Sequence, residues 1–421
     1  MEAATMPAPL VLASRGPNSE RLSAGRLNVA LVTETWPPEV NGVAHTLERL
    51  TEGLRERGHR VQVIRPRQVL DRPVAGPRHA MSPEDVTLPG IAIPGYRGLR
   101  MGLPSTRRLR RLWRHSHPDV AYIATEGPLG HAALAVARQL GIPVASGFHT
   151  RFDGYARHYG LGLLTLPVRR LLRRFHNRCG ATLVPTRALA EELREQGFLR
   201  VGVLARGVDT RRFTPARRSR TLRGQWGASG PVPVVIHVGR LAAEKNLDLV
   251  IAAFRAIQAA RPDARLVLVG DGPQRERLAR AHPDVIFAGQ QTGQALAQHY
   301  ASADLFLFPS TSETFGNVVI EAMASGLPVL AFDTAAAHEH LVDGVSGVRV
   351  SLTGARRVDE QAFVRAAREL ADHPEQWPLL GARAREHAST LDWSEVIGGF
   401  ESVLVQLVQT EARDAHASAH G

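Results

Sequence analysis

The sequence contains very little lysine, cysteine or aromatic character, and it has no long apolar run. Lys245 is the only lysine among 52 basic residues, so arginine carries almost all of the positive charge. Cys179 is the only cysteine, which excludes an intramolecular disulfide and favours a reducing compartment. No run approaches the roughly 18 apolar residues of a membrane span. The opening stretch MEAATMPAPLVLASRGPNSE lacks a basic region ahead of its apolar patch, so we expect a disordered tail over residues 1–26 and a cytoplasmic protein.

Positive charge is concentrated in the first half of the chain. The formal net charge is +12; residues 1–214 carry 32 basic and 17 acidic side chains, whereas residues 215–421 carry 20 and 23. This asymmetry favours an anionic partner, and nucleic acid, a membrane surface or an anionic substrate would fit on charge alone. The sequence has no nucleic-acid-binding motif and no exposed aromatic residues interleaved with its charge, so we expect no nucleic-acid partner.

Short apolar strands alternate with helices in two successive series. LNVALVTE and HRVQVIRP flank the helix HTLERLTEGLRERG, and later PVVIHVGR and RLVLVGDG flank NLDLVIAAFRAIQAA. This alternation predicts an α/β fold with parallel sheets covered on both faces by helices. A chain of 421 residues exceeds one core, so we expect two Rossmann-like domains, residues 27–213 and 214–395, with sheets facing a central cleft. Residues 210–231 are predicted to be a linker, and residues 396–421 a C-terminal helix and tail packing back toward the N-terminal domain.

Two cations lie in the segment GRLAAEKNLD, between a predicted strand and the next helix. This places Arg240 and Lys245 at the carboxyl edge of the sheet, where open α/β folds bind ligands. A guanidinium grips two oxygens with its planar fork, and an ammonium is a compact charge for a tighter place, so the pair suits a diphosphate. A solvated loop is the alternative, but retaining the single lysine at this position favours a functional role.

A second candidate segment is FPSTSETFGNVVIEAMASGLPV. Glu313 follows the strand, residues 315–317 begin the helix, and Glu321 lies two turns into it. Free N–H groups and the macrodipole at a helix start attract anions. Eight residues turn a helix by about 80° beyond two full turns, so the two carboxylates would contact different parts of one elongated ligand. An internal salt bridge for Glu321 and a helix-cap acid at Glu313 are the alternatives.

The first half contributes two further candidate segments. Asn41 and Gly42 follow the first strand in TETWPPEVNGVAHTL and would bring backbone N–H groups close to a phosphate, although an Asn-Gly after Pro-Pro is more often a plain turn. His149 comes just after a strand in SGFHTRFDGYARHYG, again at the ligand edge, with a structural histidine as the alternative.

In combination these motifs resemble glycosyltransferase family 4, whose members have the GT-B fold and retain the anomeric configuration. The resemblance covers about residues 27–405 and rests on GRLAAEK, LVLVGDGP, FAGQ, YASADLFLFPS and the spacing of Glu313 and Glu321. ETWPPEVNGVAHTL and SGFHTRFDGYARHYG are most similar to bacterial GDP-mannose-dependent α-mannosyltransferases. The resemblance implies a hexosyltransferase that uses a nucleotide-sugar donor, with GDP-mannose favoured, and a lipid or glycan acceptor. A UDP-sugar-dependent glycolipid glycosyltransferase and, with less support, a sugar-nucleotide epimerase are the alternatives.

The resemblance also implies roles for particular residues. Arg240 and Lys245 would bind the donor diphosphate, Glu313 would hold the sugar, and His149 would lie beside the sugar near the acceptor. The other implied donor-binding residues are Asn41 and Gly42 at the diphosphate, Phe315, Gly316 and Asn317 at the sugar, Glu321 at the ribose, and Gly289 and Gln290 at the base. No Asp or His cluster has metal-ligand spacing, so we expect the protein cations to stabilise the leaving group without a metal or cofactor.

An arginine-rich segment suggests where the acceptor side of the protein meets a membrane. In YRGLRMGLPSTRRLRRLWRHSH, seven arginines are interleaved with apolar side chains: Arg97, Arg100, Arg107, Arg108, Arg110, Arg111 and Arg114 with Met101, Leu103, Leu109, Leu112 and Trp113. Such a segment can lie on anionic lipid, which would make the protein peripheral on the inner face of the membrane. A solvated basic helix is the alternative. Residues 333–340, DTAAAHEH, differ from the glycine-rich loop common in the family, which leaves the donor sugar open.

Overall fold

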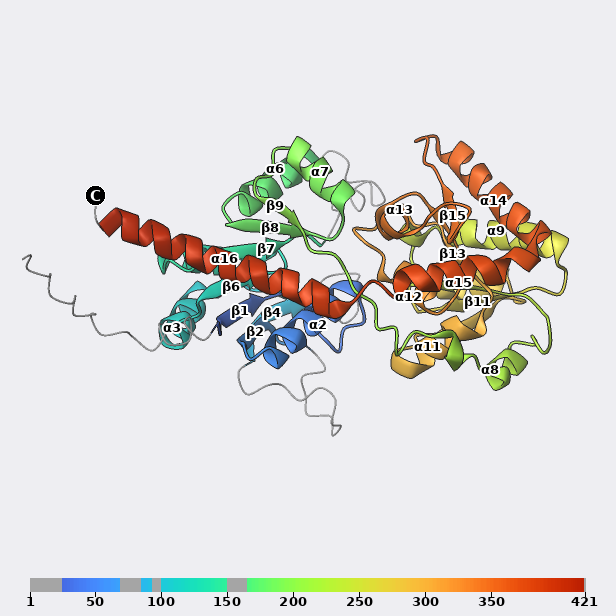
Figure 1. Cartoon of the computed structure of the whole chain (residues 1–421), viewed down its shortest axis with the longest axis horizontal. Helices are drawn as coiled ribbons and strands as arrows, with labels where there is room; N and C mark the ends of the chain where they lie inside the picture. The colour runs from blue at the N-terminus through green and yellow to red at the C-terminus, as the bar shows by residue number, and fades with distance from the viewer. Residues whose placement is uncertain (1–24, 69–84, 93–99, 150–164, 420–421) are drawn as a thin grey trace, which may run out of the picture. The chain divides into compact units, whose positions relative to one another are not determined.

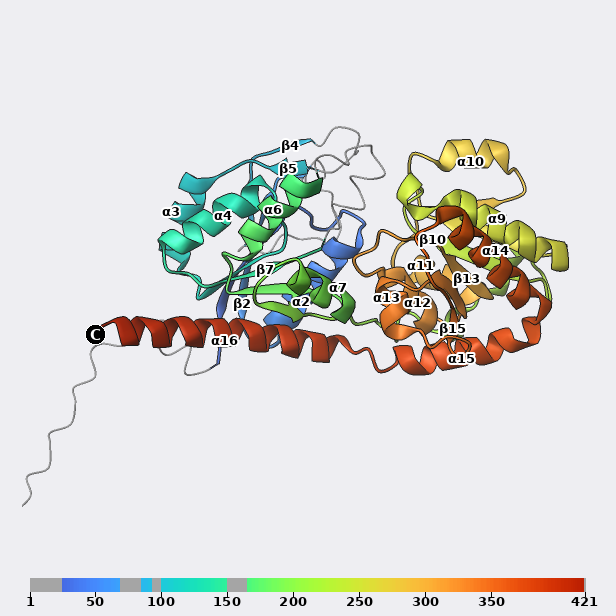
Figure 2. The ribbon, with the colours of Figure 1, turned by 90° about the horizontal axis from the view of Figure 1, so that it is seen from above.

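The computed structural model describes residues 25–68, 85–92, 100–149 and 165–419, and Figures 1 and 2 show its helices and strands. The predicted tail over residues 1–26 lies almost entirely outside this range. The chain divides into two compact units. Residues 1–39, 47–146 and 401–421 form one, and residues 40–46 and 147–400 form the other. The predicted domain boundaries and the cleft between the sheets stay predictions.

The first sheet has seven strands, in the order β3-β2-β1-β6-β7-β8-β9. Their bounds are β1 Asn28–Val32, β2 Arg60–Pro66, β3 Val86–Leu88, β6 Val120–Ile123, β7 Val144–Gly147, β8 Ala181–Val184 and β9 Val201–Val203. The pairs β1–β2, β1–β6, β2–β3, β6–β7 and β8–β9 are parallel. The accompanying helices are α2 Gly42–Glu56, α3 Thr106–Ser116, α4 Pro128–Gln139, α6 Thr165–His176 and α7 Arg187–Glu195.

The second sheet has six parallel strands, in the order β12-β11-β10-β13-β14-β15. Their bounds are β10 Val234–Val238, β11 Arg265–Val269, β12 Ile286–Gly289, β13 Leu305–Phe308, β14 Val329–Phe332 and β15 Gly347–Val350. The helices are α9 Leu247–Ala260, α10 Arg275–Ala281, α11 Gly293–Ser302, α12 Asn317–Ala324, α13 Ala335–His340, α14 Arg356–Asp372 and α15 Trp377–Ala388. The strand order reverses between β10 and β13, which makes their carboxyl ends the expected ligand-binding point of this sheet.

Most positions along the strands of the second sheet are apolar because both faces of the sheet are covered. Along β10, Val234 and Ile236 belong to one buried cluster and Val235 to another. The first cluster includes residues of α11 and α12, and the second includes residues of α9 and α14. Because side chains alternate between faces along a strand, a sheet with helices on both sides needs apolar residues at successive positions. The parallel α/β architecture predicted from these runs is therefore present.

Residues 210–231 are not the simple linker that their composition suggests. They include the 3₁₀ helix η2 Pro215–Arg217 and the helix α8 Arg220–Gln225, which Ser219 caps by accepting a hydrogen bond from the Leu222 N–H at 3.2 Å. Arg223 is buried and pairs with Asp304 at 3.0 Å, while Trp226 joins the core of the second sheet. The ion pair of the buried Arg223 and the buried indole of Trp226 anchor the segment, so its arginine content reflects packing as well as solvation.

The C-terminal helix α16, Trp393–Ala419, is a single long helix (Figure 2). Within the first unit, Glu401 on this helix accepts a hydrogen bond from Arg57 at 2.7 Å and lies 2.9 Å from the Nε2 atom of His59. Burial raises the pKa of Glu401, but the hydrogen bonds from His59 and Arg57 outweigh it and hold the pKa below its usual value. Glu401 therefore joins α16 to the region around α2 and β2.

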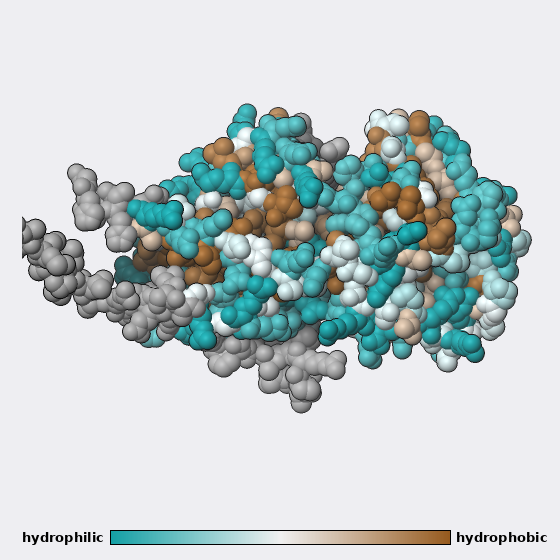
Figure 3. Space-filling model, viewed as in Figure 1, coloured by the Kyte–Doolittle hydropathy of each residue, from teal (hydrophilic) through white to brown (hydrophobic). Residues whose placement is uncertain are grey.

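The arginine-rich segment predicted to meet a membrane forms α3 over most of its length, and Arg97 lies outside the described residues. Leu109 and Trp113 are buried in the first unit, whereas Arg107, Arg108, Arg111 and Arg114 are exposed. Leu109 and Trp113 are thus already used in packing and cannot also insert into lipid while the fold is intact. Figure 3 shows that hydrophilic side chains cover most of one face of the molecule, with smaller hydrophobic areas between them. No helix among the described residues is long and apolar enough to span a bilayer.

Candidate active site

Lys245 and Glu313 meet at the reversal point of the second sheet. Lys245 ends the 3₁₀ helix η3, Ala243–Lys245, after β10, and Glu313 lies in the loop after β13. The Lys245 Nζ atom donates a hydrogen bond to Glu313 Oε1, and both side chains are 17% exposed. The Ser310 hydroxyl donates to the same Glu313 oxygen at 2.8 Å, and Lys245 Nζ lies 5.7 Å from the centre of the Phe308 ring. The sequence placed both residues at this edge, and the structure brings them into direct contact.

This ion pair keeps Glu313 ionised although the carboxylate is partly buried. Burial raises the pKa of Glu313, but the Lys245 charge and hydrogen bond, together with the Ser310 hydroxyl, outweigh it and lower the pKa below its usual value. An ammonium group has three donors, so Lys245 can hold Glu313 with one and still present the others to an incoming anion. The compact lysine head group therefore suits a position between a carboxylate and a phosphate.

His237 lies beside this pair and was not recognised from the sequence. It is a fully buried residue of β10, its Nδ1–H donates to the Leu307 carbonyl at 2.9 Å, and its Nε2 atom is buried without a hydrogen-bond partner. Burial lowers the pKa of His237 to about 4, the Leu307 hydrogen bond opposes this, and the Lys245 charge adds to it. His237 is therefore neutral at physiological pH and adds no competing positive charge. The only sequence signal was a histidine inside an apolar strand.

Arg240 follows β10 on the same loop, and a buried acid faces it. Its Nη1 atom lies 3.9 Å from Glu244 Oε1, and Glu244 is 3% exposed. The second carboxylate oxygen of Glu244 is buried without a hydrogen-bond partner. Glu244 is a further residue that the sequence reading missed, although it stands next to Lys245 in the motif. Its charge holds a cation at the carboxyl end of β10.

The backbone beneath this loop requires glycine at position 270. Gly270 has φ of +136°, and a Cβ atom there would lie 1.9 Å from the carbonyl oxygen of Gly239. Such a distance is impossible, so only glycine lets the ends of β10 and β11 approach in this way. The Gly270 N–H also donates to the carbonyl of Gly289 at 2.8 Å. The motif LVLVGDGP thus positions the loop that carries Arg240.

The start of α12 presents backbone N–H groups next to Glu313. Gly316 is the N-cap residue with φ of +89° and ψ of +68°, and the helix begins at Asn317. The first N–H groups of a helix lack partners within the helix and carry its positive dipole end. Phe315 is buried with its ring 5.7 Å from that of His340, and its carbonyl accepts from the Ala336 N–H at 2.8 Å. The three predicted positions therefore form a fixed helix start that can receive an anion or a sugar hydroxyl.

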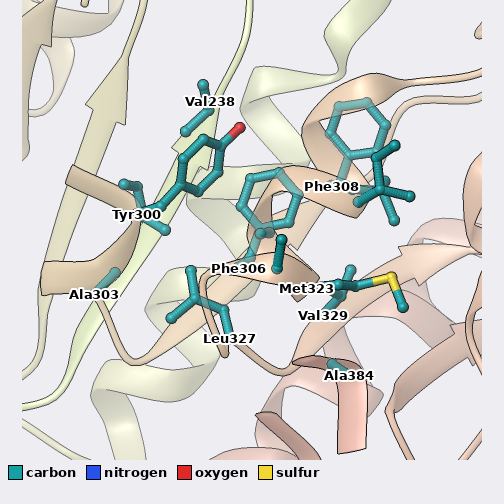
Figure 4. Packing of buried hydrophobic residues seen from close by; sticks show 14 of the residues in the cluster. Val238, Tyr300, Ala303, Phe306, Phe308, Met323, Leu327, Val329 and Ala384 are labelled. Atoms are coloured by element: carbon teal, nitrogen blue, oxygen red, sulfur yellow. The ribbon is translucent and has the colours of Figure 1, made fainter. Parts of the chain in front are cut away.

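Glu321 has an internal partner that the sequence did not reveal. The Tyr300 hydroxyl on α11 donates to Glu321 Oε2 at 3.0 Å, and Tyr300 is fully buried. Figure 4 shows Tyr300 in a row with Phe306 and Phe308, whose rings follow at centroid separations of 5.9 and 5.8 Å. Burial raises the pKa of Glu321 to about 7, against the opposing effects of the Tyr300 hydrogen bond and the Arg212 charge. The carboxyl is therefore held in place and poised between its two protonation states.

His149 lies just after β7 and is buried, as expected for a residue at the end of a strand. Its Nδ1 atom lies 3.1 Å from Arg206 Nη2, and because a guanidinium can only donate, Nδ1 accepts and Nε2 carries the proton. Burial, followed by the charges of Arg206 and His176, lowers the pKa of His149 well below its usual value. The His149 carbonyl accepts from the Thr314 hydroxyl at 2.9 Å, next to Glu313. Arg206 is a further residue that was not recognised from the sequence. The only sequence signal was an arginine that precedes a glycine shortly after a strand.

The remaining predicted residues lie at the start of α2, Asn41 and Gly42, and at the end of β12, Gly289 and Gln290. The Asn41 side chain caps α2 by accepting from the Ala44 N–H at 2.8 Å, and the Gly42 carbonyl lies 3.4 Å from Asn317 Nδ2. Gly289 ends β12 with φ of +68° and uses its carbonyl in the Gly270 contact, while Gln290 is exposed. The Asn41 side chain thus has a structural role as a helix cap, and the predicted contact of Asn41 and Gly42 with the diphosphate stays a prediction. Residues 150–164, which include Arg151, Asp153 and Tyr155, lie outside the described range.

The loop that differs from the glycine-rich pattern is strained at one residue. Ala335, the first residue of α13, has φ of +50°, a conformation that a non-glycine residue adopts at a cost of about 1 kcal/mol. His338 Nδ1 lies 3.0 Å from Asp333 Oδ1, which fixes the loop around this turn. Within the described part of the chain, no group of three His, Cys, Asp or Glu side chains could hold a metal ion. The expected independence of metal stays a prediction.

Comparison with known proteins agrees with these features. Residues 40–212 match the family model "Glycosyltransferase Family 4", and residues 232–373 match "Glycosyl transferases group 1". A GDP-mannose-dependent alpha-mannosyltransferase of Mycolicibacterium smegmatis is 35% identical over 382 residues, covering 90% of this chain and 98% of that protein. An alpha-monoglucosyldiacylglycerol synthase of Acholeplasma laidlawii is 28% identical over 345 residues, covering 76% and 84%.

Similarity to solved structures concerns the fold. Anabaena HepE, solved in complex with UDP and glucose, superposes with a TM-score of 0.69 at 19% identity, covering 90% of this chain and all of that one. Solved structures of this kind are GT-B glycosyltransferases, so the predicted GT-B fold is confirmed. The family model and the relative at 35% identity confirm the predicted family and enzyme class. The chain belongs to glycosyltransferase family 4 and is a hexosyltransferase.

Proposed function

We propose that the protein transfers an α-mannosyl group from GDP-mannose to a hydroxyl group of a lipid or glycan acceptor, with retention of configuration. The mannosyltransferase relative, 35% identical over 90% of the chain, supports the donor. The diacylglycerol synthase relative supports a lipid as one acceptor class. The observation that carries the proposal is that Lys245, Glu313 and the start of α12 converge at the reversal point of the second sheet.

In this proposal Arg240 and Lys245 stabilise the negative charge that builds on the leaving diphosphate. Lys245 is held by Glu313 and keeps donors for the phosphate oxygens, while Glu244 faces Arg240 across 3.9 Å. Preorganised cations in a site of low dielectric stabilise developing charge without a reorganisation cost. The backbone N–H groups at the start of α12 add a third source of positive potential. These groups together supply what a divalent cation supplies in other transferases.

Glu313 and His149 would act at the sugar. An ionised Glu313 accepts hydrogen bonds from sugar hydroxyls, and its charge lies near the sugar, where positive charge develops in an oxocarbenium-like transition state. His149 is neutral with its proton on Nε2, so it can donate a hydrogen bond to a sugar hydroxyl or oxygen. A histidine in this state is a poor general base at neutral pH, because Arg206 already occupies the lone pair of Nδ1. Deprotonation of the acceptor is therefore assigned to the leaving diphosphate, as the family resemblance implies.

Glu321 would bind the ribose of the donor. Tyr300 takes one carboxylate oxygen and leaves the other for the ribose hydroxyls, so the carboxyl needs no reorientation when the nucleotide arrives. Gly289 and Gln290 lie at the end of β12, two strands from β10 in the sheet order, and would meet the base through their backbone. Asn41 and Gly42 would contribute backbone N–H groups to the diphosphate.

A donor screen tests the proposal. Saturation-transfer NMR of the full chain with GDP-mannose, GDP-glucose, UDP-glucose and UDP-galactose compares the binding of base and sugar separately. We expect GDP-mannose to bind most tightly and to be consumed only when an acceptor is added. Preferential binding of UDP-sugars would favour the UDP-dependent alternative. The screen includes UDP-sugars because a protein with the same fold has been solved in complex with UDP. Conversion of the sugar nucleotide without an acceptor would instead indicate an epimerase.

We further propose that the protein works in the cytoplasm, at the inner face of the membrane. The support is the excess of basic residues in the first half of the chain and the exposed arginines of α3. Because Leu109 and Trp113 of α3 are buried, attraction to the membrane would be electrostatic rather than hydrophobic. Such binding weakens as salt shortens the Debye length, which co-sedimentation with anionic vesicles at low and high salt measures.

A further inference from the structure

Three arginines line a hollow of about 370 Å³ in the first unit, together with Pro89 and Gly90. Arg67 directly follows β2, Arg100 begins the strand β5, Arg100–Gly102, and Arg108 lies in the first turn of α3. The three guanidinium groups therefore come from three different elements. None of these residues has been assigned to the donor.

Backbone contacts hold the hollow in shape. The strand β4, Gly90–Ala92, pairs antiparallel with β5, which sets Ala92 opposite Arg100 and Gly90 opposite Gly102. Arg100 Nη2 donates to the Gly90 carbonyl, and the Arg67 N–H donates to the Leu88 carbonyl at 2.8 Å. A Cβ atom at Gly90 would lie 2.8 Å from Pro66 Cβ, so glycine keeps this wall at bare backbone. The backbone on this side of the hollow is therefore fixed by the pairing of β4 with β5 and by the close approach at Gly90.

Among the residues that the structure describes, no acidic side chain compensates the charge of the hollow. Its lining contains no acidic residue, and within the described ranges none of Arg67, Arg100 and Arg108 forms an ion pair. The contrast is Arg55 in the same unit, which pairs with Asp85 at 3.0 Å. The Nε atom of Arg100 is buried without a hydrogen-bond partner. A buried guanidinium N–H without an acceptor costs free energy, so this atom points to a missing anionic partner.

The start of α3 adds to the positive potential. The first turn of α3 has no acidic residue, and its N-cap Ser105 makes no side-chain hydrogen bond to the helix. Arg108 in this turn faces the positive end of the helix dipole, where acidic residues are favoured. The three guanidinium groups that line one hollow repel one another, and an anion among them would relieve this repulsion.

We propose that this hollow, lined by Arg67, Arg100 and Arg108, binds a phosphate group, either the phosphate of a lipid head group or a soluble phosphate ester. Guanidinium forks match the oxygens of a phosphate, and several of them around one anion give both affinity and geometry. A volume of about 370 Å³ accommodates a phosphate with a glycerol-sized substituent. This site goes beyond the proposed donor site, because it would bind a second anion while the nucleotide occupies the groups around Lys245.

The test compares two double variants of the full chain that remove the same charge. Arg67→Gln/Arg108→Gln removes two lining residues that are exposed and whose side chains form no hydrogen bond or ion pair among the described residues. The control Arg111→Gln/Arg114→Gln removes two exposed arginines of α3 that do not line the hollow. Circular dichroism and the affinity for GDP verify that both variants keep the fold and the donor site.

Calorimetry with sn-glycerol 3-phosphate and with inorganic phosphate is carried out with GDP at saturation, so that phosphate cannot enter the donor site. We expect about a tenfold loss of phosphate affinity in the lining variant and less than a twofold change in the control, as removal of charge-assisted hydrogen bonds predicts. Vesicles of phosphatidylcholine with phosphatidylglycerol, at a salt concentration that screens general attraction, form the second arm. Selective loss of vesicle binding in the lining variant identifies the lipid as the source, and selective loss of soluble phosphate alone identifies a free ester. Equal behaviour of the two double variants in both arms overturns the proposal.

Discussion

The contact between Lys245 and Glu313 predicts that Lys245 contributes to stability as well as to catalysis. Replacing Lys245 with methionine removes the cation. Of the two groups that donate to Glu313, only the Ser310 hydroxyl then remains, and the Glu313 side chain is only 17% exposed. Removing one partner of a buried ion pair costs about 3–5 kcal/mol, because the other charge stays buried without compensation. Both side chains retain some exposure, so we expect a loss of about 3 kcal/mol, at the lower end of that range.

A double variant separates the two contributions. In Lys245→Met/Glu313→Gln no unpaired charge remains and the amide still accepts from Ser310, so we expect the free energy of unfolding to recover to within about 1 kcal/mol of the wild type. Turnover should stay low, by roughly a hundredfold or more, because the double variant still lacks the cation at the diphosphate. Stability would thus return without activity.

The assay is urea unfolding followed by the midpoint and the m-value, so that a change in midpoint at constant m reports stability. The matched control is the exposed pair of Arg277 and Asp248, 2.9 Å apart with side chains 51% and 72% exposed. For Arg277→Met we expect a loss below about 1 kcal/mol, as is usual for a surface ion pair. If Lys245→Met is no more destabilising than Arg277→Met, the pair does not stabilise the loop and the reasoning fails.

Four further outcomes are expected. Lys245→Arg should turn over more slowly than the wild type although the charge is kept, because the fork is larger and its charge more diffuse, and wild-type turnover would disprove a special role for lysine. Calorimetry with GDP should show weaker binding for Glu321→Gln than for Glu313→Gln, whereas equal losses would contradict the assignment of ribose to Glu321. Binding of GDP near pH 7 should release a proton, which calorimetry in buffers of different ionisation enthalpy measures. The pKa of Glu321 is about 7 in the free protein and hydrogen bonds from the ribose hydroxyls lower it, so the affinity for GDP falls as the pH drops below 7. If Glu321→Gln releases the same number of protons, the proton comes from another group. Activity should survive excess EDTA and yield an α-linked product by proton NMR, and a β-linked product or rescue by Mg²⁺ after chelation would overturn the mechanism.

Much of the fold followed from the order of apolar runs along the chain. LNVALVTE became β1, PVVIHVGR became β10 and RLVLVGDG became β11, each within a few residues of the expected bounds. These strands are buried on both faces, so their apolar residues are consecutive and the signal is strong. The prediction of a simple linker over residues 210–231 was wrong because composition does not show that the buried Arg223 has a carboxylate partner, Asp304, 81 residues away.

The positions of the site residues also followed from local sequence. A residue just after a parallel strand lies at the carboxyl edge of its sheet whatever the rest of the chain does, and this rule placed Arg240, Lys245, Glu313 and His149. A helix start is equally local, and Gly316 and Asn317 begin α12 as expected. Each of these inferences needs only the next few residues and the period of the element.

Only the tertiary structure decided which side chains meet. Lys245 and Glu313 are 68 residues apart, His149 and Arg206 are 57 apart, and Tyr300 and Glu321 lie on different helices. No local pattern encodes these contacts, because they depend on the order of strands in the sheet and on the packing of helices over it. Burial is decided in the same way: Leu109 and Trp113 looked available to a membrane in the sequence, but α3 already packs them inside the first unit. Local residues determine where a group lies on its own element, whereas its partner, its protonation state and its exposure depend on the neighbouring elements that the fold brings beside it.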